Sequence, residues 1–567
     1  MTLRSNLQGE FMNPVNKEIV ADYVIVGAGT AGCVLANRLS ACGKYKVVLI
    51  EAGGRDSHPF IHIPAGFLRL LNHPSITWGY KTAPEKQASE REILFPRGRG
   101  LGGSSSINGL LYVRPFAADI NAWEERGAAG WNFENCLPYY IRSETWQDGR
   151  DAKRGHVGPI QVTRVLSPPA VCAEVMRAGE ELGLEMLDDP NTNTRGPSIW
   201  YYQQTRQGRF RSSAARGYLR PAASRINLSI HTDLHVMQVI MEGEGKQRTA
   251  TGVACRHGNG QIVFVKARKE VILSAGVIGT PRLLELSGIG DSHVLDNAGI
   301  RSQVALSGVG NNLQDHYVTR LCFRIQGIET ANERAHGTAL AKEVVKYVVS
   351  GDGILTYSAA VIGAFASTGL VARPDVQFVI APGSFKEGRI GELEEEPGLS
   401  FGVWQMRPES RGEVHIVSSD DSKAPSIAPR YLSDSLDRQT VIAGLRIGRQ
   451  LAGQPSLAPY VVSETVPGPQ ADSNEALLQY ARDNGSTVYH GVGTCRMGPD
   501  PAAGAVVDAN LRVHGVNRLR VIDGSVMPTM TSTNTNATVL MIAERAADLL
   551  LNDVQQADQF VQQPQRT

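Results

Sequence analysis

The feature that most constrains the fold is an apolar strand near the start of the chain that runs into a glycine-rich turn. Residues 23–26 (Tyr-Val-Ile-Val) indicate a strand buried on both faces. Residues 27–32 (Gly-Ala-Gly-Thr-Ala-Gly) form a G-x-G-x-x-G turn, after which apolar residues recur at helical spacing. Residues 46–50 predict a second strand that ends at Glu51. The pattern predicts a βαβ unit whose helix N-terminus faces the pyrophosphate of a dinucleotide.

Glu51 indicates that the ribose bound by this unit carries free hydroxyls and no 2′-phosphate. It lies 19 residues after Gly32, close to the ~20 at which an acid meets the ribose hydroxyls. A carboxylate at this point would repel a ribose 2′-phosphate. The unit alone is compatible with NAD or FAD, and a glycine-rich turn in an unrelated α/β unit is the alternative interpretation.

Length and composition narrow the class of protein. A chain of 567 residues exceeds what one hydrophobic core usually supports, which predicts two domains. The formal net charge of +1 gives no reason to expect a nucleic acid or an anionic membrane as partner. The seven cysteines are scattered without a C-x-x-C pair, which is typical of reduced thiols. No secretory or membrane-spanning segment is evident, so we expect a soluble, cytoplasmic protein with flexible tails at residues 1–17 and 553–567.

A second glycine-rich run occupies residues 96–109 (Pro-Arg-Gly-Arg-Gly-Leu-Gly-Gly-Ser-Ser-Ser-Ile-Asn-Gly). Its backbone N–H groups and serine hydroxyls could line a flat ligand. A flexible linker is the alternative, but the arginines, the Asn and the apolar residues that follow argue against it. We therefore expect this run to cover part of the cofactor.

The second run and several later segments resemble the signatures of the glucose–methanol–choline (GMC) flavoprotein oxidoreductases. The resemblance extends over most of the chain, in the order of the family's motifs. It implies FAD as cofactor and oxidation of an alcohol, with a pattern closest to choline, sorbose and aliphatic-alcohol dehydrogenases. The matching segments are residues 78–80, 96–109, 274–281, 286–290, 312–316, 490–498 and 521–528.

The departures from the family pattern bear on how the flavin is held. Ile107 stands where some relatives carry a histidine bonded covalently to the flavin, so we expect non-covalent FAD. Gly491 and Thr538 stand where many relatives have proline, and these changes should adjust only the local backbone. The loop chemistry and the resemblance together give these candidate cofactor contacts: Gly27, Gly29, Thr30, Ala31, Gly32, Glu51, Ala52, Arg99, Gly102, Gly103, Ser104, Asn108, Gly109, Val236, Ala275, Asp523, Gly524, Asn534, Thr535 and Asn536.

His490 and Asn534 are the candidate catalytic residues. Oxidation of an alcohol requires the hydroxyl proton to leave as the α-hydride moves to flavin N5, and an imidazole suits the proton step. The amide of Asn534 could hold the same oxygen, although Asn is also a common helix cap and Asn536 suits that role better. The helix that follows should point its positive N-terminus at the flavin's pyrimidine edge. Asp523 is either near the cofactor or simply a residue that ends a strand.

The strand signals predict an α/β fold with a discontinuous, Rossmann-like FAD domain and an α+β substrate domain. We assign residues 18–165, 216–320 and 489–552 to the FAD domain and residues 166–215 and 321–488 to the substrate domain. The second domain should contain an antiparallel sheet with helices on one face, built from pieces such as residues 375–380, 401–406 and 413–418. It should shape the substrate pocket above the flavin.

The predicted function is FAD-dependent oxidation of a primary or secondary alcohol to an aldehyde or ketone. Oxygen or a quinone-like compound would accept the electrons. The alternatives are a non-redox lyase resembling the flavin-containing hydroxynitrile lyases, and an NAD-linked dehydrogenase. No metal site is expected, because the histidine pairs at 231/235 and 58/62 lack a third ligand nearby in sequence.

Overall fold

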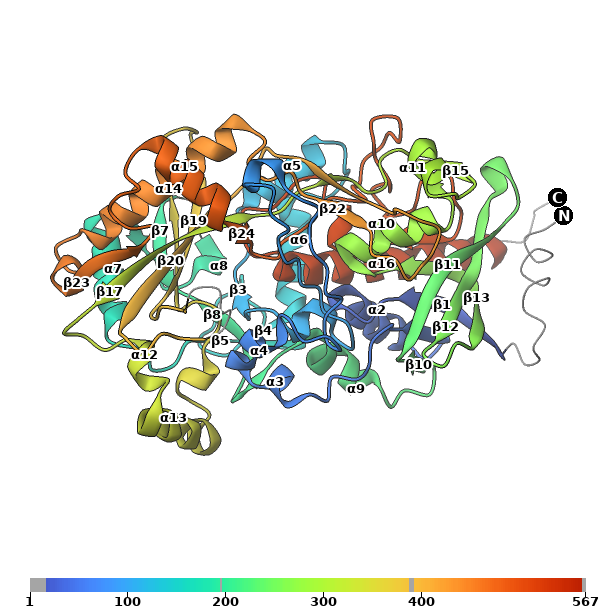
Figure 1. Cartoon of the computed structure of the whole chain (residues 1–567). Coiled ribbons are helices and arrows are strands. Elements are labelled where there is room, and N and C mark those ends of the chain that lie inside the picture. The colour runs from blue at the N-terminus through green and yellow to red at the C-terminus, as the bar shows by residue number, and fades with distance from the viewer. Residues whose placement is uncertain (1–16, 194–195, 387–391, 563–567) are drawn as a thin grey trace.

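The computed structural model describes residues 17–193, 196–386 and 392–562. Its two large sheets lie at opposite ends of an elongated molecule, joined by loops and short helices from the first third of the chain (Figure 1). Among the described residues, no helix combines the length and apolarity needed to cross a bilayer.

The nucleotide-binding end is a sheet with the order β10-β2-β1-β13-β12-β11, with β25 also paired to β13. Strands β10, β2, β1, β13 and β25 run parallel, whereas β12 pairs antiparallel with both β13 and β11. This confirms a Rossmann-like unit assembled from distant segments. The strands are β1 (Lys17–Val26), β2 (Val47–Ile50), β10 (Leu228–His231), β11 (Leu234–Glu242), β12 (Thr249–His257), β13 (Ile262–Leu273) and β25 (Leu519–Val521).

Helices cover this sheet and bury its apolar strands. Tyr23 to Val26 of β1 are buried, as their composition predicts. Two helices far apart in sequence, α2 (Thr30–Ser40) and α16 (Asn536–Gln562), pack side by side and are joined by Arg38, which donates two hydrogen bonds to Glu544. The other helices at this end are α9 (Arg220–Ala222), α10 (Gly276–Leu286) and α11 (Ser292–Asn297).

Helix α16 continues past residue 553, where the sequence suggests that a tail begins. Asp553 is half-buried and accepts hydrogen bonds from Arg512 and Arg520. These ion pairs tie Asp553 to Arg520 of β25 and to Arg512, which precedes that strand. The other predicted tail, residues 1–17, lies almost entirely outside the described residues.

The opposite end contains a sheet with the order β23-β17-β20-β19-β18-β7-β6, with β24 also paired to β17. All its pairings except β6 with β7 are antiparallel. Helix α14 (Ser435–Ala452) packs on one face through Gly444 and Gly448, where a Cβ would lie 2.7 Å from Val403 and 2.4 Å from Leu321. Helices α7 (Val171–Glu181) and α15 (Asn474–Asn484) pack beside it. The strands are β6 (Glu185–Met186), β7 (Ser198–Tyr201), β17 (Tyr317–Ile325), β18 (Ile362–Ala366), β19 (Val376–Ala381), β20 (Gly398–Gln405), β23 (Val461–Val466) and β24 (Ser486–Thr487).

One predicted strand belongs to a different sheet. Residues 413–418 were expected in the large antiparallel sheet, but β21 (Gly412–His415) pairs with β16 (Asn311–Leu313) and β22 (Ser426–Ala428). A further small sheet has the order β3-β8-β5-β4, with β9 paired to β8, and β14 pairs with β15. These strands are β3 (Leu111–Tyr112), β4 (Glu144–Trp146), β5 (Ile160–Arg164), β8 (Gln203–Gln207), β9 (Phe210–Arg211), β14 (Ile289–Gly290) and β15 (Val304–Ala305).

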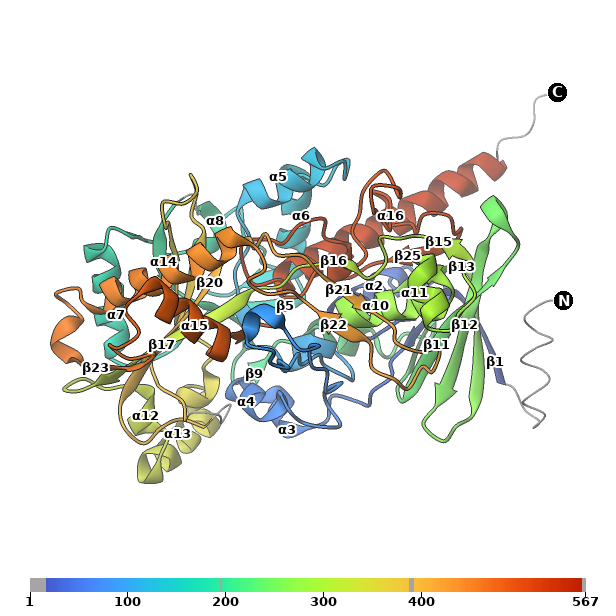
Figure 2. The ribbon, with the colours of Figure 1, turned by 45° about the horizontal axis from the view of Figure 1, so that its top comes forward.

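The remaining helices lie between the two ends or project from the surface. Helix α13 stands out from the body of the molecule in both views, with α3 and α4 on the same side (Figures 1 and 2). These helices are α3 (Pro59–His62), α4 (Phe67–Leu70), α5 (Ala117–Glu125), α6 (Phe133–Ser143), α8 (Pro190–Asn193), α12 (Ala331–Arg334) and α13 (Gly337–Ser350).

Candidate active site

The two glycine-rich segments pack against each other backbone to backbone. Gly27 ends β1 with φ +96°, and a Cβ there would lie 2.6 Å from the carbonyl oxygen of Ser274. Gly102 donates its N–H to the carbonyl of Ala28 at 2.8 Å. A Cβ on Gly103 would lie 2.7 Å from the Cα of Gly29. Only glycine permits these approaches, which bring both loops to one floor of the site.

The Glu51 carboxylate ties the same loops together. Oε2 accepts the N–H of Ala28 at 2.9 Å, and Oε1 accepts those of Gly53 at 2.8 Å and Gly100 at 2.9 Å. Burial raises the pKa of Glu51, and these three N–H groups oppose that rise. The side chain therefore has a structural role in addition to the ribose contact expected for it.

The N-termini of α2 and α16 meet at the site. Thr30 donates its hydroxyl hydrogen to Oδ1 of Asn536 at 3.0 Å, although 506 residues separate them. No side chain caps the N-terminus of α2. Both helix N-termini thus present N–H groups and partial positive charge to the same space, as an anionic ligand requires.

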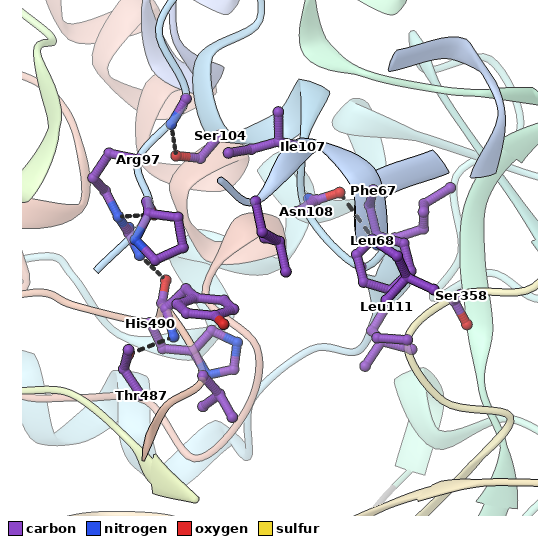
Figure 3. Close-up of a pocket in the computed structure, with 18 of the residues that line it drawn as sticks. Phe67, Leu68, Arg97, Ser104, Ile107, Asn108, Leu111, Ser358, Thr487 and His490 are labelled. Atoms are coloured by element: carbon purple, nitrogen blue, oxygen red, sulfur yellow. Dashed lines mark hydrogen bonds between the residues drawn. The ribbon is translucent and has the colours of Figure 1, made fainter. Parts of the chain in front are cut away.

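These elements border a cavity of about 1660 Å³ between the two large sheets. The cavity exceeds the ~300–1,000 Å³ of a typical small-ligand pocket, and so has room for a dinucleotide and a substrate. Arg97, Thr487 and His490 gather on one side of the drawn part, and Phe67, Leu68, Leu111 and Ser358 on the other (Figure 3). The predicted residues that line it are Gly27, Gly29, Thr30, Ala31, Glu51, Ala52, Gly103, Ser104, Asn108, Gly109, Val236, Ala275, His490, Asp523, Gly524, Asn534, Thr535 and Asn536.

Three predicted contacts, Gly32, Gly102 and Arg99, do not line the cavity. Gly32 faces the carbonyl oxygen of Gly27, where a Cβ would lie at 1.9 Å, so its role is close packing of helix and turn. Gly102 donates to the first loop, as described above. The guanidinium of Arg99 lies over the ring of Trp78, 5.2 Å from its centroid.

Asp523 and Asn108 line the cavity, but their side chains bind protein groups. Asp523 Oδ2 accepts the N–H of Gly276 at 2.8 Å and the hydroxyl of Thr280 at 2.6 Å, which fixes the start of α10. Oδ1 of Asn108 accepts from Arg211 at 2.6 Å. Any cofactor contact from Asp523 would therefore come from its backbone.

His490 and Asn534 meet as the sequence predicted. Nδ2 of Asn534 lies 3.0 Å from Nε2 of His490, which is 44 residues earlier in the chain. Oδ1 of Asn534 is buried and has no hydrogen-bond partner among the described residues. An unsatisfied acceptor of this kind is costly, and a donor on a bound ligand would satisfy it.

A second histidine, His316, determines the tautomer of His490. Nε2 of His316 lies 2.8 Å from the carbonyl oxygen of Met406, and its Nδ1 lies 2.9 Å from Nδ1 of His490. A carbonyl only accepts, so Nε2 of His316 carries the hydrogen and its Nδ1 is an acceptor. His490 must then donate from Nδ1. Its Nε2 is therefore an unprotonated base that faces Asn534.

Burial keeps both imidazoles neutral. It lowers the pKa of His490 well below the ordinary value, and the charges of His316 and Arg97 act in the same direction. Burial also lowers the pKa of His316 to about 4. The His490 backbone is fixed as well, because its N–H donates to Asp315 at 2.8 Å and Tyr489 before it has φ +69°. The sequence signal for His316 was its place in the 312–316 motif, to which no role was assigned.

No cluster of three or more histidine, cysteine or acidic side chains suited to a metal occurs among the described residues. His235, one of the paired histidines, contacts Asp421 at 3.2 Å instead.

Comparisons with known proteins show the family of the chain. The family profile described as GMC oxidoreductase matches residues 21–318 in its N-terminal part and 408–543 in its C-terminal part. The chain belongs to the GMC oxidoreductase family.

Its relatives include alcohol and choline dehydrogenases. The alcohol dehydrogenase [acceptor] of Pseudomonas putida is 37% identical, over 94% of this chain and 96% of its own length. The oxygen-dependent choline dehydrogenase of Photobacterium profundum is 36% identical, over 94% of this chain and 93% of its own length.

Solved structures show the same fold. Pyridoxine 4-oxidase from Mesorbium loti superposes with a TM-score of 0.83 at 28% identity, over 93% of this chain and 98% of that one. A variant of Aspergillus oryzae formate oxidase, studied for its FAD modification, superposes with a TM-score of 0.88 at 25% identity. The match covers 96% of this chain and 100% of that one. The cofactor of this protein is FAD. The paired glycine loops, the helix N-termini at Thr30 and Asn536 and the size of the cavity fit that group.

Proposed function

We propose that this protein oxidises a primary or secondary alcohol to an aldehyde or ketone, with His490 as the base for the hydroxyl proton. The single observation that carries the proposal is the fixed tautomer of His490. The hydrogen bonds of His316 with the Met406 carbonyl and with His490 leave Nε2 of His490 unprotonated at the cavity wall. This nitrogen lies 3.0 Å from the amide of Asn534. Bound FAD supplies the two-electron acceptor for the hydride.

Asn534 is suited to hold the reacting oxygen. Its Nδ2 lies 3.0 Å from Nε2 of His490, so an alcohol must displace that hydrogen bond; the alcohol oxygen can then accept from Nδ2 while its hydroxyl donates to Nε2. Its unpartnered Oδ1 is available to a second donor on a ligand. A base and an oxygen-binding amide fixed on adjacent segments provide the positioning that proton transfer in a transition state requires.

Proton uptake at Nε2 leaves the ring of His490 in place but requires the amide of Asn534 to move, because its Nδ2 donates to that lone pair in the resting site. When Nε2 is protonated, Nδ1 still donates to His316, so the ring keeps its orientation. The low pKa of His490 means that the resting site holds a neutral base even in mildly acidic solution.

The lining near His490 favours an uncharged alcohol. The ring of Trp404 lies 6.0 Å from that of His490, and Arg97 adds a half-buried cation with no ion-paired partner among the described residues. Glu394 also lines the cavity but pairs with Arg324 at 3.2 Å. The carboxylates among the described lining residues, Glu51, Asp523 and Glu394, all bind protein groups, so none of them is free for a quaternary ammonium group such as that of choline.

Electrons would pass to oxygen or to a quinone-like acceptor. The NAD-linked alternative is set aside because the cofactor is FAD. An anaerobic mixture of the purified protein with a series of alcohols tests the oxidation directly: the flavin's visible absorbance should bleach and return on addition of air or a dye. A lyase would leave the absorbance unchanged, and that result would contradict the proposal.

We further propose that FAD is held without a covalent bond. Ile107 lines the cavity and carries no nucleophile. Acid precipitation should then release all the flavin into the supernatant, whereas a yellow pellet would show a covalent link elsewhere.

A further inference from the structure

Exposed apolar side chains are concentrated around one edge of the cavity. Helix α13 exposes Val344, Val345, Val348 and Val349, with Val349 76% accessible. Phe210 on β9 and Phe60 on α3 are also exposed, at 38% and 41%. Other exposed large apolar residues, such as Val157 and Ile226, belong to unrelated surface segments. We call the surface formed by α3, α4, β9 and α13 the mouth face.

The parts of the mouth face are physically joined. Tyr347 of α13 donates its hydroxyl to the carbonyl of Arg209 at 2.9 Å, and Arg209 donates back to the carbonyl of Val348. Helix α3 contacts β9, and the turn at residues 64–66 contacts the turn at 354–356, on which α13 also packs. Helix α13 stands out from this surface as a ridge (Figures 1 and 2).

The mouth face is continuous with the cavity that holds His490. Val344 and Val348 line that cavity, as do Phe60 and Leu68. Val345 and Val349 lie one position further along the helix and do not line it. The ridge thus carries an inner row of valines at the cavity and an outer row, 61% and 76% accessible, that does not line it.

Unpaired cations surround the apolar ridge. Within the described part of the chain, Arg69, Lys342, Arg209 and Arg216 form no ion pair. Two nearby carboxylates are ion-paired, Asp352 with Lys346 at 3.0 Å and Asp56 with Arg220 at 3.4 Å, whereas Glu343 accepts the N–H of Ile354 at 2.8 Å and keeps its charge. Apolar side chains flanked by free cations are the chemistry of helices that lie in an anionic lipid interface.

We propose that the mouth face docks on an anionic lipid surface, with the outer valines of α13 among the headgroups and the cavity entrance turned toward the bilayer. A second copy of the chain fits this face less well, because a two-fold contact would bring the same four cations together. Docking would let an apolar alcohol, or a lipid-dissolved electron acceptor, enter without crossing water. The docking itself does not depend on the reaction proposed above.

Co-sedimentation of the FAD-loaded protein with vesicles tests this inference. Vesicles of phosphatidylcholine with an equal part of phosphatidylglycerol should carry the protein down, and vesicles of phosphatidylcholine alone should carry about tenfold less. Added salt should weaken the binding, because it screens the cations. Equal binding to both vesicle types, or to neither, would overturn the proposal.

Substitutions on α13 test whether the mouth face is the surface that binds lipid. Val345→Asp/Val349→Asp should reduce binding at least about tenfold, and the neutral pair Val345→Ser/Val349→Ser should reduce it less. Val417→Asp, at an exposed valine outside the mouth face, is the matched control and should bind as wild type. Retained flavin and unchanged turnover of a short, water-soluble alcohol would show that each variant is folded. Lipid docking would be contradicted if Val345→Asp/Val349→Asp bound vesicles as well as wild type. It would also be contradicted if sedimentation velocity showed a wild-type dimer that this variant abolishes.

Discussion

His316 and His490 face each other through their Nδ1 atoms at 2.9 Å, and the carbonyl of Met406 on the far side of His316 decides which of them donates. The neutral pair therefore has one hydrogen-bonding arrangement. It leaves Nε2 of His490 as the only unprotonated nitrogen directed at Asn534. His316, which touches neither substrate nor cofactor, thus determines which nitrogen of His490 is protonated.

His316→Ala should lower kcat by about 10–100-fold, the usual effect of losing a partner that orients a reacting group. The KM of the alcohol should change little, because His316 does not line the cavity. His316→Gln should restore much of the rate, since its amide can donate to Met406 while its carbonyl accepts from His490. Steady-state kinetics of both variants measure these changes. An equal loss of kcat in the two variants would show that His316 acts only through packing.

Acid should destabilise the fold partly through His316. Burial lowers its pKa in the folded protein to about 4, while the unfolded chain binds the proton near the ordinary value of ~6.5. The unfolded state then holds more protons below that value, so this contribution to stability is present above pH ~6.5 and is lost as the pH falls toward 4. Between pH 7 and pH 4 the free energy of unfolding of His316→Gln should fall by about 3 kcal/mol less than that of wild type. Urea unfolding at both pH values measures this difference, and parallel falls would refute it.

Gly103→Ala should weaken FAD binding, because its Cβ would lie 2.7 Å from the Cα of Gly29 and separate the two loops. The flavin content of the purified variant should be well below one per chain. Gly43→Ala is the matched control: Gly43 also has positive φ, but a Cβ there meets nothing within 4 Å. Full flavin occupancy in Gly103→Ala would show that the close contact of the loops does not shape the cofactor site.

An uncharged alcohol should be preferred over choline. 3,3-Dimethylbutan-1-ol replaces the quaternary nitrogen of choline with carbon and keeps its shape, so the pair isolates the effect of charge. We expect kcat/KM to be at least about tenfold higher for the neutral alcohol, since a buried cation without a counter-charge is costly. A preference for choline would mean that the substrate's cation finds an anionic partner despite the engaged carboxylates.

The parts of the fold that the sequence predicted are those specified by residues close together in the chain. The buried strand at residues 23–26, the glycine turn and Glu51 form one local pattern, and the structure has β1, α2 and β2 there. The strand within 413–418 was also evident locally. Its partners were not, because pairing with β16 depends on tertiary contacts.

The same distinction applies to the site. His490 and Asn534 were identified through the motifs that carry them, but His316 lies 174 residues before His490 and only the fold brings the two rings together. The course of α16 at residue 553 depends on the fold in the same way. Its composition favours a tail, and the ion pairs of Asp553 come from Arg512 and Arg520, which only the fold brings close to it.

The rate of flavin reduction by an alcohol without oxygen, compared between wild type and His490→Ala, tests the central claim most directly. The variant should keep its FAD and reduce it on the order of 10²–10⁴-fold more slowly, the usual contribution of a positioned base. His293→Ala, at an exposed histidine on α11, should reduce its flavin at the wild-type rate. A near-normal rate in His490→Ala would contradict the assignment of His490 as the base.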